Sequence, residues 1–179
     1  MTKILGLSGS LRRASFNSGL LRAAKEVAPA GVEVEIGSIA DVPLYNGDIE
    51  AEQGVPEGVK ILHDQLRGSA ALLLVTPEYN NGVPGVFKNA IDWMSSGHGA
   101  ALFRNKPAAV IGASPGGFGT ILAQAHWLPV LRALGMHPWF EGRLMVLRAG
   151  AVFDKQGNLS DHETRKRLAD FMAGFAAAL

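Results

Sequence analysis

Short apolar segments that alternate with stretches of helical periodicity constrain the fold more than any other feature of this sequence. The expected strands are residues 3–8, 32–38, 70–76, 107–113 and about 136–147. The run Leu72-Leu73-Leu74-Val75 is apolar on both faces, as in strands that are covered by helices on each side. The expected helices are residues 17–28, 56–67, 84–96, 118–134 and 161–178, and residues 39–56 are expected to form a long loop. This strand–helix order, repeated along the chain, predicts an α/β fold with a doubly wound parallel sheet.

The composition predicts one globular domain over residues 1–179. Hydrophobic residues make up 47% of the chain and charged residues 18%, and no linker or repeat divides it. The net charge of +1 gives no indication of nucleic-acid binding. Cysteine is absent, which excludes thiol catalysis and disulfides. No apolar run approaches the ~18 residues of a membrane span, and we expect a cytoplasmic protein.

Three loops are candidates for a ligand site. In doubly wound sheets, ligands bind beyond the carboxyl ends of the strands, where the strand order reverses. The loops after the first, third and fourth expected strands are residues 9–17, 76–84 and 114–119.

The first of these loops has the sequence GSLRRASFN, from Gly9 to Asn17. It opens a helix, and the free N–H groups and dipole of a helix N-terminus favour a phosphate. Ser10, Ser15 and Asn17 add neutral donors, and Arg12 adds a positive charge. The alternative is that Ser15 or Asn17 only caps the helix. The loop matches neither the Walker motif nor the Gly-x-Gly-x-x-Gly fingerprint.

In the second loop, from Thr76 to Gly85, two prolines and two glycines favour an exposed, rigid backbone. Its peptide groups are suited to face a planar heterocycle, and Tyr79 is placed to pack on such a ring. The alternative is an ordinary rigid turn that enters the helix 84–96, in which Phe87, Ile91 and Met94 are expected to be core residues.

The third loop contains the pattern Gly112-Ala-Ser114-Pro-Gly116, which matches the nucleophile elbow of serine hydrolases. That elbow uses the backbone N–H of the residue after the serine, and Pro115 has none. The remaining prediction is a glycine-rich turn whose amides approach the edge of a ligand. The five histidines show no metal-ligand spacing, so no metal site is expected.

Together these loops resemble the NAD(P)H-dependent FMN reductase family of the flavodoxin-like fold, and most of all its quinone- and chromate-reducing bacterial members. The resemblance covers essentially the whole chain. Beside the turn Ser114-Pro-Gly-Gly117, the matching motifs are Gly9-Ser10-Leu11-Arg12-x-x-Ser15-x-Asn17, Pro77-Glu78-Tyr79-Asn80 with Pro84-Gly85, and Lys88-Asn89-Ala90-Ile91-Asp92-Trp93.

The resemblance implies a three-layer sandwich with a five-stranded parallel sheet of order 2-1-3-4-5 and helices on both faces. It implies FMN, with its phosphate at Ser10, Arg12, Ser15 and Asn17, with Phe16 and Ser18 nearby, and with its ring against Pro77, Glu78, Tyr79, Asn80, Ser114, Pro115, Gly116 and Gly117. NADPH or NADH would pass a hydride through FMN to quinone-like, flavin, azo or metal-oxyanion acceptors in a ping-pong cycle, with no catalytic side chain. The alternatives are a flavodoxin-type electron carrier and a flavin-binding regulatory protein with low turnover.

The resemblance also implies a homodimer or homotetramer that forms through helices 84–96 and 118–134. The second of these helices supports the idea independently, because it carries two apolar stripes: Phe118, Leu122, Ala125 and Leu128, and Ala123, Trp127, Val130 and Leu134. One stripe can pack on its own domain, and the other then needs a partner. We expect Pro129 to kink this helix and Ser160 with Glu163 to form a capping box for the last helix.

Overall fold

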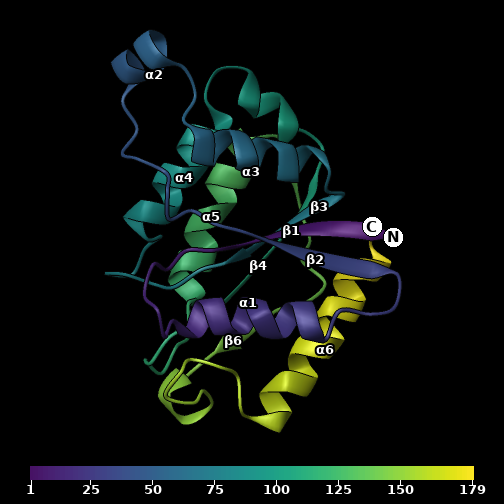
Figure 1. The fold of residues 1–179 in the computed structure, drawn as a ribbon. Coiled ribbons are helices and arrows are strands. Elements are labelled where there is room, and N and C mark those ends of the chain that lie inside the picture. Colours follow the sequence, from purple (N-terminus) through teal and green to yellow (C-terminus); the bar gives the residue numbers. More distant parts are fainter.

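The computed structural model describes residues 1–179 as three layers (Figure 1). In chain order the elements are β1 (Thr2–Ser8), α1 (Phe16–Glu26), β2 (Val32–Gly37), α2 (Gly47–Gln53), α3 (Glu57–Arg67), β3 (Ala71–Val75), α4 (Gly85–Ser95), the 3₁₀ helix η1 (Gly97–Leu102), β4 (Pro107–Ala113), α5 (Ile121–Ala133), β5 (His137–Pro138), β6 (Met145–Val146), the 3₁₀ helix η2 (Ala149–Ala151) and α6 (His162–Ala177). Helices α1 and α6 cover one face of the sheet, and α3, α4 and α5 cover the other. None of the helices is long and apolar enough to cross a membrane.

The sheet confirms the predicted topology. Its order is β2-β1-β3-β4-β5, and every pairing is parallel. The order reverses at β1, since the chain moves outward to β2 and then returns to β3 on the other side of β1. The loops after β1, β3 and β4 therefore open at the same edge of the sheet, where a doubly wound fold binds its ligands.

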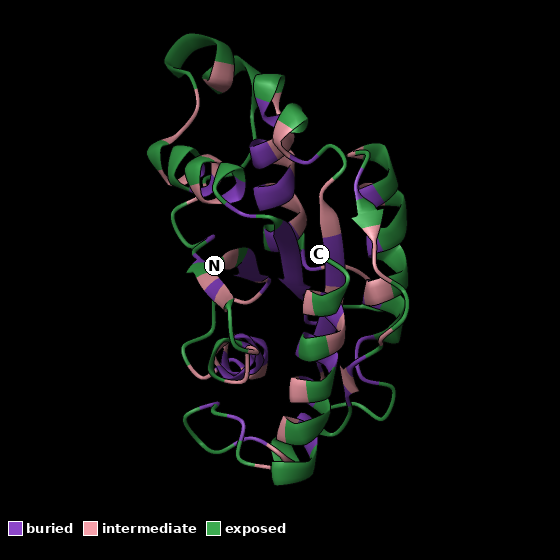
Figure 2. Cartoon of the chain, turned by 90° about the vertical axis from the view of Figure 1, so that its right-hand side faces the viewer, coloured by how far each residue is buried: buried purple, intermediate pink, exposed green.

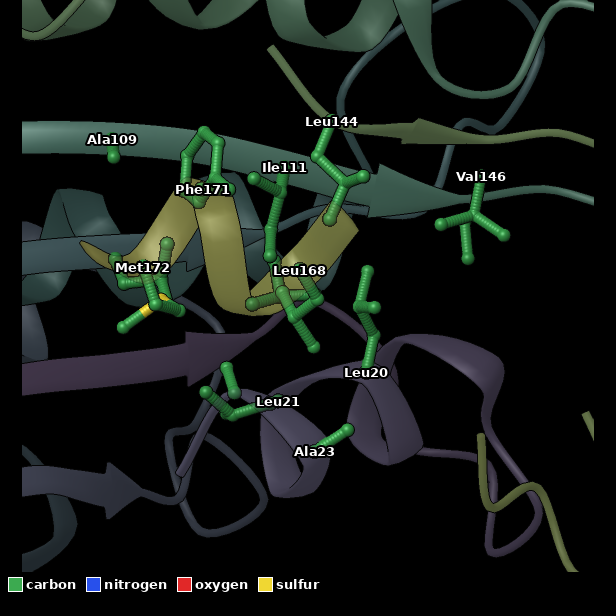
Figure 3. Packing of buried hydrophobic residues seen from close by; sticks show 14 of the residues in the cluster. Leu20, Leu21, Ala23, Ala109, Ile111, Leu144, Val146, Leu168, Phe171 and Met172 are labelled. Atoms are coloured by element: carbon green, nitrogen blue, oxygen red, sulfur yellow. The ribbon is translucent and has the colours of Figure 1, made fainter. Parts of the chain in front are cut away.

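The strands separate two hydrophobic cores, as their all-apolar sequences predict (Figure 2). In β3, Leu72 and Leu74 face α3, α4 and α5, whereas Leu73 faces the core under α1 and α6. Figure 3 shows the core under α1 and α6, in which Leu20 and Leu21 of α1 meet α6 beneath β4. Complete burial contributes roughly 1.5–3 kcal/mol for each such leucine. This packing holds the helical layers on the sheet, and the ends of the same strands position the loops.

The fifth position of the sheet differs from the prediction. Instead of one strand over residues 136–147, β5 pairs with the start of β4 and β6 pairs with its end. Between them the chain leaves the sheet after Trp139, whose N–H still donates to the Ala108 carbonyl at 2.8 Å. The Trp139 ring packs beneath α6, with its centroid 5.1 Å from that of Phe171 and 5.5 Å from that of Phe175.

The predicted loop 39–56 is also wrong in part, because it contains α2. Asn46 caps this helix by accepting a hydrogen bond from the N–H of Asp48 at 2.9 Å. The segment is fastened to α4 through Pro43, whose carbonyl accepts from Asn89 Nδ2 at 2.8 Å and from Trp93 Nε1 at 2.9 Å. These two donors belong to the motif Lys88–Trp93.

Two helix starts need correction. Helix α6 is capped by Asp161, which accepts from the Thr164 N–H at 2.7 Å, while the Ser160 hydroxyl donates to the Val152 carbonyl; the Ser160 capping box is wrong. Helix α5 begins at Ile121 and not at residue 118, because Gly119 has a φ of +63° and belongs to the preceding turn.

Helix α5 separates its two apolar stripes as expected. Trp127 is fully buried, with its ring 4.9 Å from that of Phe87, whereas Phe118, just before the helix, is 79% exposed and Leu122 is 42% exposed. Pro129 lies inside the continuous helix. The stripe left open is therefore the one that contains Phe118 and Leu122, and the stripe that contains Trp127 belongs to the domain's own core.

Candidate functional site

The three predicted loops meet in one pocket at the carboxyl ends of β1, β3 and β4. Ten of the fourteen predicted site residues line it: Ser10, Arg12, Ser15, Phe16, Asn17, Pro77, Glu78, Tyr79, Ser114 and Pro115. The eleventh lining residue is Ala113, the last residue of β4, which the sequence interpretation missed because it was assigned only to the strand.

The other four predicted residues lie beside this pocket. The hydroxyl of Ser18 forms a hydrogen bond with that of Ser8 at 3.0 Å and lines a neighbouring depression toward β2. Asn80, Gly116 and Gly117 are exposed at the rims of the second and third loops.

The first loop ends at Ser15, which is the N-cap of α1. Its Oγ accepts the N–H of Ser18 at 3.2 Å, and the side chain is almost fully buried. An accepting hydroxyl keeps its own proton, so capping leaves Ser15 able to donate to a ligand. Arg12 is exposed and forms no ion pair with any carboxylate of the chain. The loop thus combines a capped helix N-terminus with a free guanidinium.

Asn17 joins the first loop to the third. Its Nδ2 donates to the Ala113 carbonyl at 2.9 Å, and its Oδ1 accepts the Ala113 N–H at 2.8 Å. Both groups of this buried carboxamide are thus bonded to the backbone of one residue at the end of β4. One Nδ2 proton remains for a further acceptor, while the main task of the side chain is to fix the distance between the two loops.

Glu78 plays a similar part for the second loop. Its Oε2 accepts the N–H groups of Leu122 and Ala123, each at 2.9 Å, at the N-terminus of α5. A carboxylate at this end of a helix is stabilised by the helix dipole. The only carboxylate that lines the pocket is therefore held in place by two hydrogen bonds from a helix N-terminus to one of its oxygens.

Tyr79 is held by a tight turn that follows Glu78. Its backbone pairs with that of Gly82 at 3.1 and 3.0 Å, and the two residues between them, Asn80 and Asn81, have φ values of 49° and 62°. Two consecutive positive φ values describe the hairpin turn that asparagine favours. This turn leaves the Tyr79 side chain 47% exposed at the mouth of the pocket.

The third loop is held from the side by the chain after β6. The N–H of Arg148 donates to the Gly116 carbonyl at 2.9 Å, and the N–H of Ala149 donates to the Ser114 carbonyl at 3.0 Å. The Ser114 hydroxyl accepts the N–H of Gly116 at 3.1 Å, so it has the role of a turn-forming side chain. Residues 146–149 were not predicted as part of the site, and nothing in their sequence indicates this pairing.

The site has the features of an anion-binding and ring-binding surface. It combines a helix N-terminus, one free arginine, several hydroxyl groups and exposed peptide edges. Space is open at Gly117, where an added Cβ would meet no atom within 4 Å. No group of three His, Cys, Asp or Glu side chains is placed to hold a metal ion.

The sequence matches the model of the family described as NADPH-dependent FMN reductase over residues 2–150. The chain belongs to this family. An NAD(P)H-dependent FMN reductase of Pseudomonas aeruginosa is 44% identical over 164 residues, which cover 92% of this chain and 88% of the relative. A quinone reductase of Escherichia coli K12 is 42% identical over 171 residues, which cover 90% of this chain and 89% of the relative.

Among solved structures, the flavoenzyme NAD(P)H:(acceptor) oxidoreductase of Paracoccus denitrificans superposes with a TM-score of 0.87 at 35% identity, covering 99% of this chain and 96% of that one. The flavodoxin-like fold is confirmed by this match and by the strand order. As a member of the FMN reductase family, the chain is an oxidoreductase.

The residues of this FMN reductase fit the cofactor that the family name implies. A phosphate suits the N-terminus of α1, where Arg12 has no acidic partner and the Ser15 hydroxyl retains a proton. A planar ring suits the exposed peptide edges of the second and third loops.

Proposed function

We propose that the protein is an FMN-dependent NAD(P)H oxidoreductase that reduces quinone-like acceptors. The observation that carries the proposal is the convergence of three loops on one pocket in which the only carboxylate, Glu78, is bonded to a helix. Such a site can bind and orient a redox cofactor, but its side chains offer no acid–base pair of their own. Bound FMN would supply the redox chemistry, by taking a hydride from NAD(P)H and passing two electrons to the acceptor.

The chain's own groups would bind and orient the cofactor. Arg12, Ser10 and Ser15 would hold the phosphate together with the first N–H groups of α1, and Asn17 would offer its remaining Nδ2 proton. The peptides of Pro77–Asn80 and Ser114–Gly117 would border the ring. The N–H of Gly117 would donate to the pyrimidine edge of the ring, where negative charge develops, and so would that of Gly116 once it exchanged its bond to the Ser114 hydroxyl.

Quinones are the preferred acceptors in this proposal, since a close relative is named quinone reductase. The balanced reaction converts NAD(P)H, a proton and a quinone into NAD(P)⁺ and a hydroquinone. Flavin, azo and metal-oxyanion acceptors would use the same open face. If donor and acceptor occupy that face in turn, the kinetics are ping-pong.

The first experiment is the absorbance spectrum of the purified protein, followed by titration with FMN. We expect a yellow protein, or one that binds one FMN per chain. A colourless protein that leaves the fluorescence of added FMN unchanged would refute the proposal.

Steady-state kinetics then test the turnover and its order. Fast NAD(P)H oxidation with a quinone distinguishes the reductase from an electron carrier or a regulatory flavoprotein, both of which should be slow. The net charge of +1 also argues against a carrier with an acidic docking face. Parallel double-reciprocal plots are expected, and intersecting plots would exclude a shared face.

We also propose a homodimer or homotetramer in the cytoplasm, assembled through the open faces of α4 and α5. Val86 on α4 is 40% exposed, as is Leu128 on α5, and Phe118, just before α5, is also exposed. Because Trp127 is fully buried, its replacement by Glu would unfold the domain and cannot test this interface. A wild-type monomer in light scattering at working concentration would contradict this proposal.

A further inference from the structure

A fourth loop, distinct from the three that form the pocket, lies directly behind the first loop. This loop, Phe153–Leu159, follows η2 and precedes α6, and in Figure 1 it lies beside the N-terminal end of α1. We refer to it as the rear loop. None of its residues lines the pocket described above, so any influence on a ligand there must pass through the first loop.

The rear loop is closed by Asp154. This carboxylate accepts the N–H groups of Gln156 at 2.9 Å and Asn158 at 2.8 Å, and also the side-chain amide of Asn158 at 3.1 Å. The backbone hydrogen bond from Asn158 is the largest cause that lowers the pKa of Asp154 below its usual value. Gly157, at the tip, has a φ of +79°, a conformation that favours glycine.

The tip of the rear loop packs against the first loop, backbone against backbone. A Cβ added at Gly157 would lie 2.8 Å from the carbonyl carbon of Ala14 and 3.0 Å from its oxygen. A Cβ added at Gly19, in the first turn of α1, would overlap the carbonyl oxygen of Gly157. Glycine is therefore required at both Gly157 and Gly19, and the rear loop touches the chain on either side of Ser15, at Ala14 and at Gly19.

Side chains fasten the same contact. Nη2 of Arg22, on α1, donates to Asn158 Oδ1 at 2.7 Å and to the Gly157 carbonyl at 3.4 Å. The rings of Phe16 and Phe153 lie 5.2 Å apart. The rear loop thus contacts both Ala14, the residue before Ser15, and the first two turns of the helix that Ser15 caps.

We propose that Asp154, Gly157 and Arg22 are positioning residues for the FMN phosphate. Ala14 immediately precedes Ser15 and lies two residues after Arg12, so a displacement of Ala14 by the rear loop moves both phosphate-binding groups. Hydrogen bonds to a phosphate depend steeply on distance and angle, whereas no hydrogen bond joins the rear loop to either of the two ring-binding loops. The inference rests on the proposed function, because it assumes that FMN places its phosphate at this helix N-terminus.

The test is a fluorescence titration of apoprotein with FMN and with riboflavin, which has the same ring and no phosphate. Gly157→Ala should lower the affinity for FMN at least about tenfold, the loss expected when one charge-assisted hydrogen bond is misplaced. The affinity for riboflavin should stay within about twofold, because the ring does not use these groups. Gly150→Ala is the matched control, since a Cβ there meets no atom within 4 Å, and it should leave both affinities unchanged.

Arg22→Ala provides a second variant that leaves the backbone of both loops intact, in case Gly157→Ala does not fold. It should reduce FMN affinity selectively, and Arg22→Lys should restore part of the loss. Equal losses for FMN and riboflavin, or no loss in either variant, would overturn the positioning role. A wild-type protein that binds FMN and riboflavin equally would instead refute the phosphate site itself, and the proposal for the rear loop with it.

Discussion

Replacing Asn17 with alanine should loosen the domain and the site together. The change removes two buried hydrogen bonds, of 2.9 Å to the Ala113 carbonyl and 2.8 Å from the Ala113 N–H. A buried hydrogen bond contributes about 1 kcal/mol, and a buried backbone group left without a partner costs about 1–3 kcal/mol. With the Ala113 N–H and carbonyl both left unpaired, we expect a loss of about 2–4 kcal/mol in the free energy of unfolding.

The assay is urea unfolding of the apoprotein followed by tryptophan fluorescence, with Gln53→Ala as the control for removing an exposed carboxamide. The control should change stability by less than about 0.5 kcal/mol. Because Asn17 sets the distance between the first and third loops, the variant should also weaken the binding of both flavins, and FMN more than riboflavin because the remaining Nδ2 proton is lost as well. A stability loss below about 1 kcal/mol, or an unchanged affinity for riboflavin, would contradict the role of Asn17 as a link between loops.

Four further predictions address the other groups of the site and the surface. Arg12→Ala should weaken FMN binding about tenfold or more and leave riboflavin unaffected, whereas Arg13→Ala should change neither; equal affinities of the wild type for the two flavins would refute the phosphate site. Glu78→Ala should lower the melting temperature through loss of a helix cap worth about 0.5–2 kcal/mol, and it should weaken the binding of both flavins. An unchanged affinity for riboflavin would contradict the role of Glu78 in positioning the ring-binding loop. Phe118→Glu should shift light scattering toward monomers with no change in melting temperature, and an unchanged assembly would exclude this face. Hydrogen bonds from Thr164 lower the pKa of Asp161. The contribution of Asp161 to the free energy of unfolding is therefore present above the usual carboxyl pKa and disappears as the pH falls through the lowered pKa. In unfolding experiments between about pH 5 and pH 2, Asp161→Asn should be less sensitive to acid than the wild type.

The parallel sheet and the edge at which its loops meet could be predicted because they depend on local patterns. A strand such as β3, apolar on both faces, can be buried only between two helical layers. The edge strand could not be predicted in the same way. Residues 136–147 form an uninterrupted strand pattern in the sequence, whereas the packing of Trp139 beneath α6 is a contact between distant parts of the chain that no local pattern indicates.

The roles of the polar residues show the same limit. The sequence placed Asn17 and Glu78 in the site, and both lie there, but their hydrogen bonds go to Ala113 and to the start of α5. No local pattern indicates that a side chain will bond to a backbone 44 or 96 residues away. The choice of Asp161 over Ser160 as the cap of α6 is a smaller example, since either residue type can cap a helix.

This use of polar side chains has a consequence for the chemistry. In a list of pocket residues Glu78 would look like a catalytic carboxylate and Asn17 like a free hydrogen-bonding amide, yet each is bonded to backbone groups that the fold would otherwise leave unpaired. The groups that remain free toward a ligand include the guanidinium of Arg12, the hydroxyl protons of Ser10 and Ser15, the second Nδ2 proton of Asn17 and exposed peptide groups. Peptide groups held in this way keep their direction before a ligand arrives, so little reorganisation is needed when charge develops on a bound ring. The rigid loops are therefore suited to hold the cofactor in a fixed orientation. Because the pocket contains no acid–base pair of side chains, the transfer of electrons is left to the cofactor.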